Sequence, residues 1–95
     1  MEPGDGTEYV AECFWPGVTQ EELDSLDERA RTAASASSAL PARYLGSILM
    51  REDEVVLCRF EGTEDAVRAL AERAAVPFER IVEATTPRPP DEGRR

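Results

Sequence analysis

The 95-residue sequence contains no histidine. Without an imidazole the chain cannot form a Ser-His-Asp or Cys-His catalytic unit, a His-Glu-x-x-His zinc site or an iron site with two histidine ligands. A glycine-rich phosphate loop is also absent, because Gly4 and Gly6 do not lie between an expected strand and an expected helix. We therefore expect no cofactor, and any catalysis would rest on carboxylate, tyrosine and arginine side chains.

Cysteines and long apolar runs are scarce as well. Cys13 and Cys58 are the only cysteines, and neither belongs to a Cys-x-x-Cys pair. No apolar run approaches the roughly 20 residues that a membrane span needs, and the first seven residues lack the positive and apolar regions of a signal peptide. We expect a cytoplasmic protein in which both cysteines are reduced and Cys58 acts as a small, buried apolar residue.

Basic residues are outnumbered by acidic ones. Lys and Arg number 11 and Asp and Glu 20, which gives a net charge of −9. This sign repels nucleic-acid phosphates and anionic lipid headgroups, so we expect neither nucleic acid nor membrane as a partner. The charge also keeps a small domain soluble, and it leaves cations, basic partners and neutral small molecules open.

The residues that are present predict four strands and two helices. The strands are expected over 8–15, 43–51, 54–60 and 78–84. One helix follows Thr19, which forms a capping-box pattern with Glu22, and its Asp27 is expected to pair with Arg31 four residues later. The other helix follows Thr63.

Two further signals set the element boundaries. The second helix is expected to end near Ala75, because Pro77 disfavours helix at the residue before it. A tight turn is expected at Glu52–Asp53, where Asp tolerates left-handed backbone.

The order β-α-β-β-α-β predicts an α+β, ferredoxin-like fold, with an antiparallel four-stranded sheet and both helices on one face. The domain spans 8–84, between a flexible leader over 1–7 and a flexible C-terminal tail over 85–95. Cys13 and Cys58 are expected near strand ends that do not face each other, which argues against a disulfide.

The two central strands are apolar on both sides. In the strand over 43–51, one face is expected to carry Tyr44, Ile48 and Met50, and the opposite face Leu45 and Leu49. In the strand over 54–60, one face is expected to carry Val55 and Leu57, and the opposite face Val56, Cys58 and Phe60. The two helices can cover only one face of the sheet. If the apolar side chains of the other face stayed exposed to water, the lost free energy would be comparable with the net stability of a small domain. We therefore predict a homodimer that packs sheet to sheet. The alternative is that the Ser-rich segment after the first helix, or the C-terminal tail, covers this face.

An interface of this kind can enclose an apolar pocket. We expect a small apolar ligand there, with Trp15, Tyr44, Ile48 and Leu57 as candidate ligand-binding residues. If the pocket were catalytic, Glu12 would act as a base, Tyr44 would donate a hydrogen bond and Arg59 would bind an anionic group.

Each of these residues also has a structural interpretation. Glu12 can pair across strands with Arg59 or Arg43. Tyr44 and Trp15 can be core or interface aromatics.

Several segments resemble a known family. They are Tyr9-Val10-Ala11-Glu12, Pro16-Gly17, Cys58-Arg59-Phe60-Glu61, Glu64-Asp65-Ala66-Val67-Arg68, Pro77 and Arg80-Ile81-Val82-Glu83. Over residues 8–84 the chain resembles a small bacterial ferredoxin-like family of unknown function, whose named member is a Streptomyces nickel-binding protein. The resemblance implies a ferredoxin-like dimer and the binding of a divalent metal.

The chain departs from this family at one position. The second strand of the family often carries a histidine where this chain has Gly46. Nickel favours imidazole and thiolate ligands, and only Cys13 and Cys58 offer sulfur, so we assign no metal ligands.

The sequence thus predicts a small homodimeric binding or interaction protein. The alternatives are a cofactor-independent cyclase, isomerase or oxygenase acting on a small hydrophobic metabolite, and a nickel-binding protein.

Overall fold

A computed structural model describes residues 7–84 of the chain. The elements are β1 (Glu8–Phe14), α1 (Gln20–Ala36), β2 (Ala42–Met50), β3 (Val55–Gly62), α2 (Glu64–Arg73) and β4 (Arg80–Ala84). This is the predicted β-α-β-β-α-β order. Apart from Thr7, the expected leader and tail lie outside the described residues.

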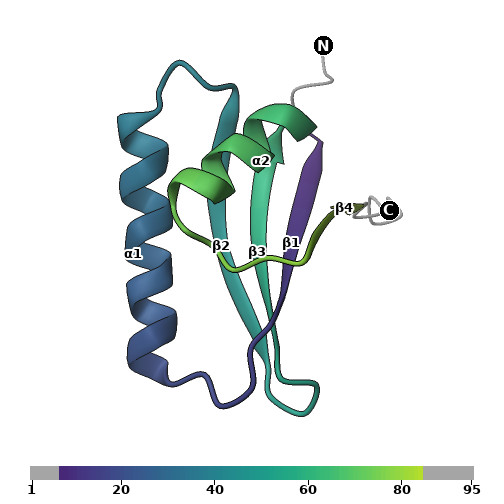
Figure 1. Ribbon diagram of the computed structural model, residues 1–95. Helices are drawn as coiled ribbons and strands as arrows, with labels where there is room; N and C mark the ends of the chain where they lie inside the picture. Colours follow the sequence, from purple (N-terminus) through teal and green to yellow (C-terminus); the bar gives the residue numbers. More distant parts are fainter. Residues whose placement is uncertain (1–6, 85–95) are drawn as a thin grey trace, which may run out of the picture.

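The four strands form one antiparallel sheet in the order β2-β3-β1-β4. Both helices lie on the same side of it, with α2 crossing in front of the central strands and α1 running beside them (Figure 1). The predicted ferredoxin-like arrangement is confirmed. Within the described residues, one side of the sheet carries no helix, and we call this side the open face.

The capping predictions are confirmed by side-chain hydrogen bonds. The Thr19 hydroxyl accepts from the Glu22 N–H at 3.1 Å, and the Glu22 carboxylate accepts from the Thr19 N–H at 2.9 Å. Helix α2 ends at Arg73, two residues before the expected boundary. Ala75 takes a φ of 57°, a left-handed conformation that ends a helix.

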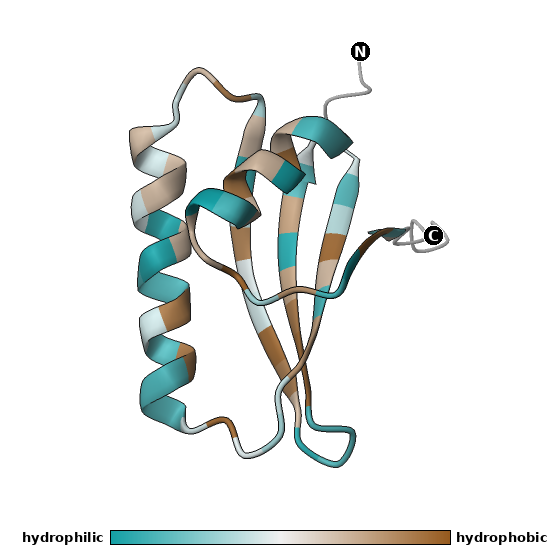
Figure 2. Cartoon of the chain, in the orientation of Figure 1, coloured by the Kyte–Doolittle hydropathy of each residue, from teal (hydrophilic) through white to brown (hydrophobic). Residues whose placement is uncertain are grey.

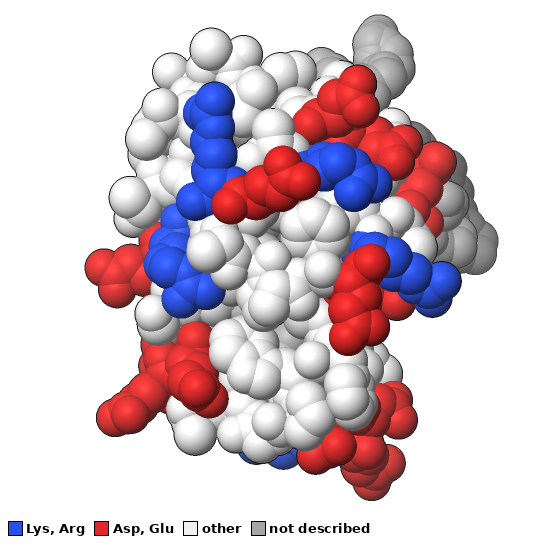
Figure 3. Space-filling model, in the orientation of Figure 1, with Lys and Arg blue, Asp and Glu red and all other residues white. Residues whose placement is uncertain are grey.

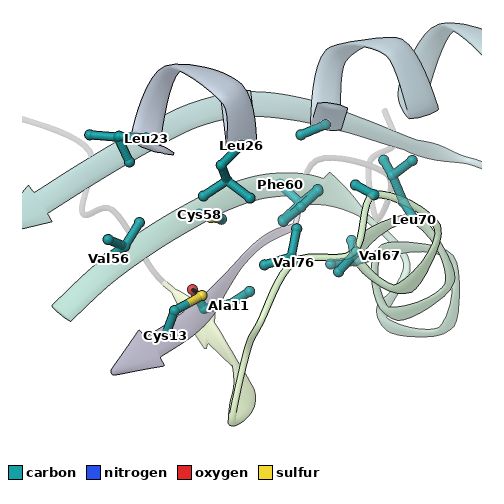
Figure 4. Packing of buried hydrophobic residues seen from close by; sticks show 13 residues of the cluster. Ala11, Cys13, Leu23, Leu26, Val56, Cys58, Phe60, Val67, Leu70 and Val76 are labelled. Atoms are coloured by element: carbon teal, nitrogen blue, oxygen red, sulfur yellow. Dashed lines mark hydrogen bonds between the residues drawn. The ribbon is translucent and has the colours of Figure 1, made fainter. Parts of the chain in front are cut away.

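The hydrophobic core lies between the sheet and the two helices (Figure 4). The largest fully buried side chains come from all of these layers: Phe60, Leu26, Leu70, Val56, Val67, Cys13 and Cys58. Figure 2 shows apolar residues along the strands and polar ones at the turn between β2 and β3. Strand β3 alternates between half-buried and buried residues along its whole length, so Val55 and Leu57 lie on one side and Val56, Cys58 and Phe60 on the other, as predicted.

The predicted face of Tyr44 is wrong, because a β-bulge interrupts β2, whereas Ile48 and Met50 lie on the face opposite to Leu49, as predicted. Tyr44 pairs with Phe60 and Gly46 pairs with Arg59, so Leu45 is an extra residue without a register partner. A bulge shifts the alternation of all residues after it. Tyr44 and Leu49 consequently pack against the core, while Ile48 and Met50 lie on the open face.

The β2–β3 turn also differs from the expectation. Its backbone bonds run from Asp53 N–H to the Met50 carbonyl and from Glu54 N–H to the Arg51 carbonyl, both at 3.2 Å. Glu54, with a φ of 57°, takes the left-handed position that we expected of Asp53.

Candidate functional site: the open face of the sheet

The strand register determines which residues share the open face. Four rows run across the strands, each containing residues that pair directly with one another. They are Arg43, Glu61, Glu8 and Ala84; Gly46, Arg59, Val10 and Val82; Ile48, Leu57, Glu12 and Arg80; and Met50, Val55 and Phe14.

An apolar patch occupies the end of this face nearest the β2–β3 turn. Phe14, Ile48 and Met50 are the exposed large hydrophobic residues among those described, with 56%, 47% and 40% of their surface accessible. Val55 lies between Phe14 and Met50, and Leu57 lies beside Ile48. We call these five residues the apolar patch. The predicted second apolar side of the sheet therefore exists at this end.

Ion pairs occupy the rest of the face. They join Arg43 to Glu61 at 3.2 Å, Arg59 to Glu8 at 2.8 Å and Arg80 to Glu12 at 2.7 Å. The three pairs hold three positive and three negative charges. The strand residues of the open face are thus electrically balanced, with one further carboxylate, Glu79, at the edge, although the whole chain has a net charge of −9. On the helix-bearing side, acidic groups gather at the lower left and along the right edge (Figure 3).

The predicted partner of Glu12 is wrong. Glu12 binds Arg80 on β4, rather than Arg59 or Arg43, because Arg80 pairs with Glu12 directly in the register. Arg59 binds Glu8, which lies one row away on β1. The Glu8 carboxylate raises the pKa of Arg59, and the Glu12 carboxylate raises that of Arg80.

A hollow of about 300 Å³ lies at the edge of the apolar patch. It is lined by Glu12, Phe14, Val55, Glu79 and Arg80. Its walls are the side chains of Phe14 and Val55, the Glu12–Arg80 ion pair and the Glu79 carboxylate, so it offers a small molecule both apolar and charged contacts. Phe14 and Arg80 are site residues that the sequence reasoning missed, although Phe14 continues the alternation Val10, Glu12, Phe14 along β1.

Tyr44 does not lie on the open face. Its ring packs 5.2 Å from that of Phe60, and its hydroxyl donates to Asp27 on α1. The Ser47 hydroxyl donates to the same carboxylate oxygen at 2.8 Å. Burial and the Asp27 carboxylate both raise the pKa of Tyr44. Asp27 therefore accepts hydrogen bonds from two side chains of β2, in place of the expected ion pair with Arg31 on its own helix.

Trp15 is also separate from the open face. It is half-buried, it packs against the core, and its backbone N–H donates to the Glu54 carbonyl at 2.7 Å. Among the candidate residues, Glu12, Ile48, Leu57 and Arg59 thus share the open face. Tyr44 and Trp15 instead support the core.

The two cysteines are free thiols, as expected, and both are buried. They lie nearer to each other than predicted, because Cys13 pairs with Val56 and Cys58 with Ala11, which makes them diagonal neighbours on one face (Figure 4). The neighbouring Cys13 thiol and burial raise the pKa of Cys58.

No group of three or more histidine, cysteine, aspartate or glutamate side chains within residues 7–84 is arranged to hold a metal ion. None of the helices in the same part of the chain is long and apolar enough to cross a membrane.

Comparisons with known proteins identify a solved structure with a similar fold. No family model matches the chain, and no curated protein matches it. The solved structure of SCO4226 from Streptomyces coelicolor A3(2) is similar to it, with a TM-score of 0.64 and 19% sequence identity. The match covers 85% of this chain and 99% of that one. The chain therefore has the fold of this Streptomyces protein, and the resemblance drawn from the sequence is confirmed at the level of the fold.

Proposed function

We propose that the protein is a non-catalytic binding or interaction protein that works as a homodimer joined through the open face. The observation that carries the proposal is the apolar patch, which lies on a charge-balanced face of an otherwise acidic chain. Two copies of a chain with a net charge of −9 repel each other wherever their acidic surfaces meet. On the open face this repulsion is absent.

Burial of the apolar patch supplies the driving force. Phe14, Ile48 and Met50 each leave 40% or more of their surface exposed. Apolar area contributes about 25 cal/mol per Å² when it is removed from water. A second copy buries two such patches at once, and it also covers the hollow beside Phe14, where a small apolar ligand can be held.

The ion pair of Glu12 favours this proposal over the cofactor-independent enzyme. A general base must be available to take a proton from a substrate. The Glu12 carboxylate is already bound to Arg80 at 2.7 Å, and the predicted donor Tyr44 lies on the other side of the sheet, bound to Asp27.

The test places a charge within the patch. Ile48→Glu should give a monomer by light scattering, because two carboxylates would be buried in the joined faces. Thr32→Glu, on the exposed side of α1, is the matched control and should keep the mass of the wild type. Equal masses for the two variants would reject the open face as the interface.

A further inference from the structure

The open face carries both a protrusion and a gap. Phe14 is the most exposed large apolar side chain among the described residues, at 56%. Gly46 lacks a side chain, and no atom lies within 4 Å of the position that a Cβ would take there. Its φ of 128° disfavours other residues, so the β2 bulge helps to keep this gap open.

The register fixes where the two features lie. Phe14 is on β1, opposite Val55 of β3, and Gly46 is on β2, opposite Arg59 of β3. Because β3 runs between β1 and β2, the line from Phe14 to Gly46 crosses β3 midway between Val55 and Arg59. The open-face residue at this midpoint is Leu57.

A two-fold axis sets a strict condition on such pairs. When residue i of one copy contacts residue j of the other, j contacts i as well, and the point midway between i and j lies on the axis. We propose that two copies pack about a two-fold axis through Leu57, so that Phe14 of each copy fills the gap over Gly46 of the other. This inference rests on the proposed open-face dimer and names its register.

The chemistry of β3 supports Leu57 as the residue on the axis. A residue on a two-fold axis faces its own copy, so a charged one would meet a like charge. The open-face residues of β3 are Val55, Leu57, Arg59 and Glu61. Arg59 and Glu61 are charged, and Val55 lies at the end of the face. Leu57 is uncharged and lies nearer the centre, so it can pack against its own copy without electrostatic cost.

A second copy suits this face better than an unlike partner. The ion pairs balance the charge around Leu57, so a strongly charged partner gains nothing there. Phe14 and the gap at Gly46 lie on the same face. In an isologous contact, Phe14 of each copy can enter the gap of the other, so the same contact forms at two places.

Cross-linking tests the register directly. Stacked sheets lie about 10 Å apart, a spacing that inter-sheet disulfides bridge in sandwich domains. Under mild oxidation Leu57→Cys should form a covalent dimer, since the two introduced thiols face each other across the axis. The native thiols are buried, so the wild type should give none. Val55→Cys, two residues along the same face and off the axis, should cross-link far more slowly.

A second variant tests the protrusion. Phe14→Ala should raise the dissociation constant of the dimer by roughly a hundredfold, since both copies lose an aromatic anchor. Fast cross-linking of Val55→Cys in place of Leu57→Cys, or an unchanged dissociation constant for Phe14→Ala, would overturn the register while the dimer stands. A monomeric wild type by light scattering would overturn the dimer and the register together.

Discussion

The hydroxyl of Tyr44 on β2 donates a hydrogen bond to the carboxylate of Asp27 on α1. Because the Ser47 hydroxyl donates to the same oxygen at 2.8 Å, one carboxylate fixes the longer helix to an edge strand of the sheet. Because this strand contains the bulge at Leu45, Tyr44 faces the helix while Ile48 and Met50 lie on the open face. The contact therefore helps to hold the strand that carries part of the apolar patch.

Removing this carboxylate should destabilise the domain. Asp27→Ala leaves two half-buried hydroxyl groups without their acceptor, and we expect a loss of about 1.5–3 kcal/mol in the free energy of unfolding. Urea denaturation measures it. Asp24→Ala removes an exposed carboxylate from the same helix and should change the free energy of unfolding by less than about 0.5 kcal/mol. Equal losses would mean that the bond to Tyr44 contributes nothing.

Tyr44 should also make the protein sensitive to alkaline pH. Burial and the Asp27 carboxylate raise its pKa in the folded state, while an unfolded tyrosine ionises near pH ~10. Above about pH 10 the unfolded chain releases this proton and the folded one keeps it, so the free energy of unfolding falls as pH rises. Below about pH 10 the contribution is fully present.

The control for this effect is Tyr44→Phe. Its free energy of unfolding between about pH 9 and 11.5 should fall less steeply than that of the wild type, since the tyrosine with the strongly raised pKa is gone. Parallel pH profiles for the two proteins would contradict the role given to Tyr44.

Nickel should not stabilise the protein. A metal requires deprotonated thiols, whereas both cysteines are buried, and the neighbouring Cys13 thiol and burial raise the pKa of Cys58. We expect no rise in the melting temperature at millimolar Ni²⁺. A rise that disappears in Cys58→Ser would instead support the nickel binding implied by the family resemblance.

Local signals in the sequence predicted most of the fold. The cap at Thr19, the start of a helix after Thr63 and the two faces of β3 depend on neighbours a few residues away, and the structure confirms them. The bulge at Leu45 was missed. A glycine within an expected strand is a known sign of a bulge, but Gly46 alone does not tell which residue becomes the extra one.

The candidate site was harder to predict than the fold, because it depends on register. Glu12 binds Arg80, 68 residues away, and Arg59 binds Glu8, 51 residues away. Both pairs follow from how β1 lies against its neighbours. A shift of one residue in β2 was enough to move Tyr44 from the expected pocket into the core. The apolar character of the open face survived this shift because Ile48 and Met50 lie beyond the bulge.

The most direct measurement is the mass of the wild-type protein by light scattering over a dilution series. We predict twice the chain mass of 10.5 kDa at micromolar concentration, with dissociation only on further dilution. A mass of one chain at every concentration would show that the apolar patch does not join two copies, and the proposed function would have to be abandoned.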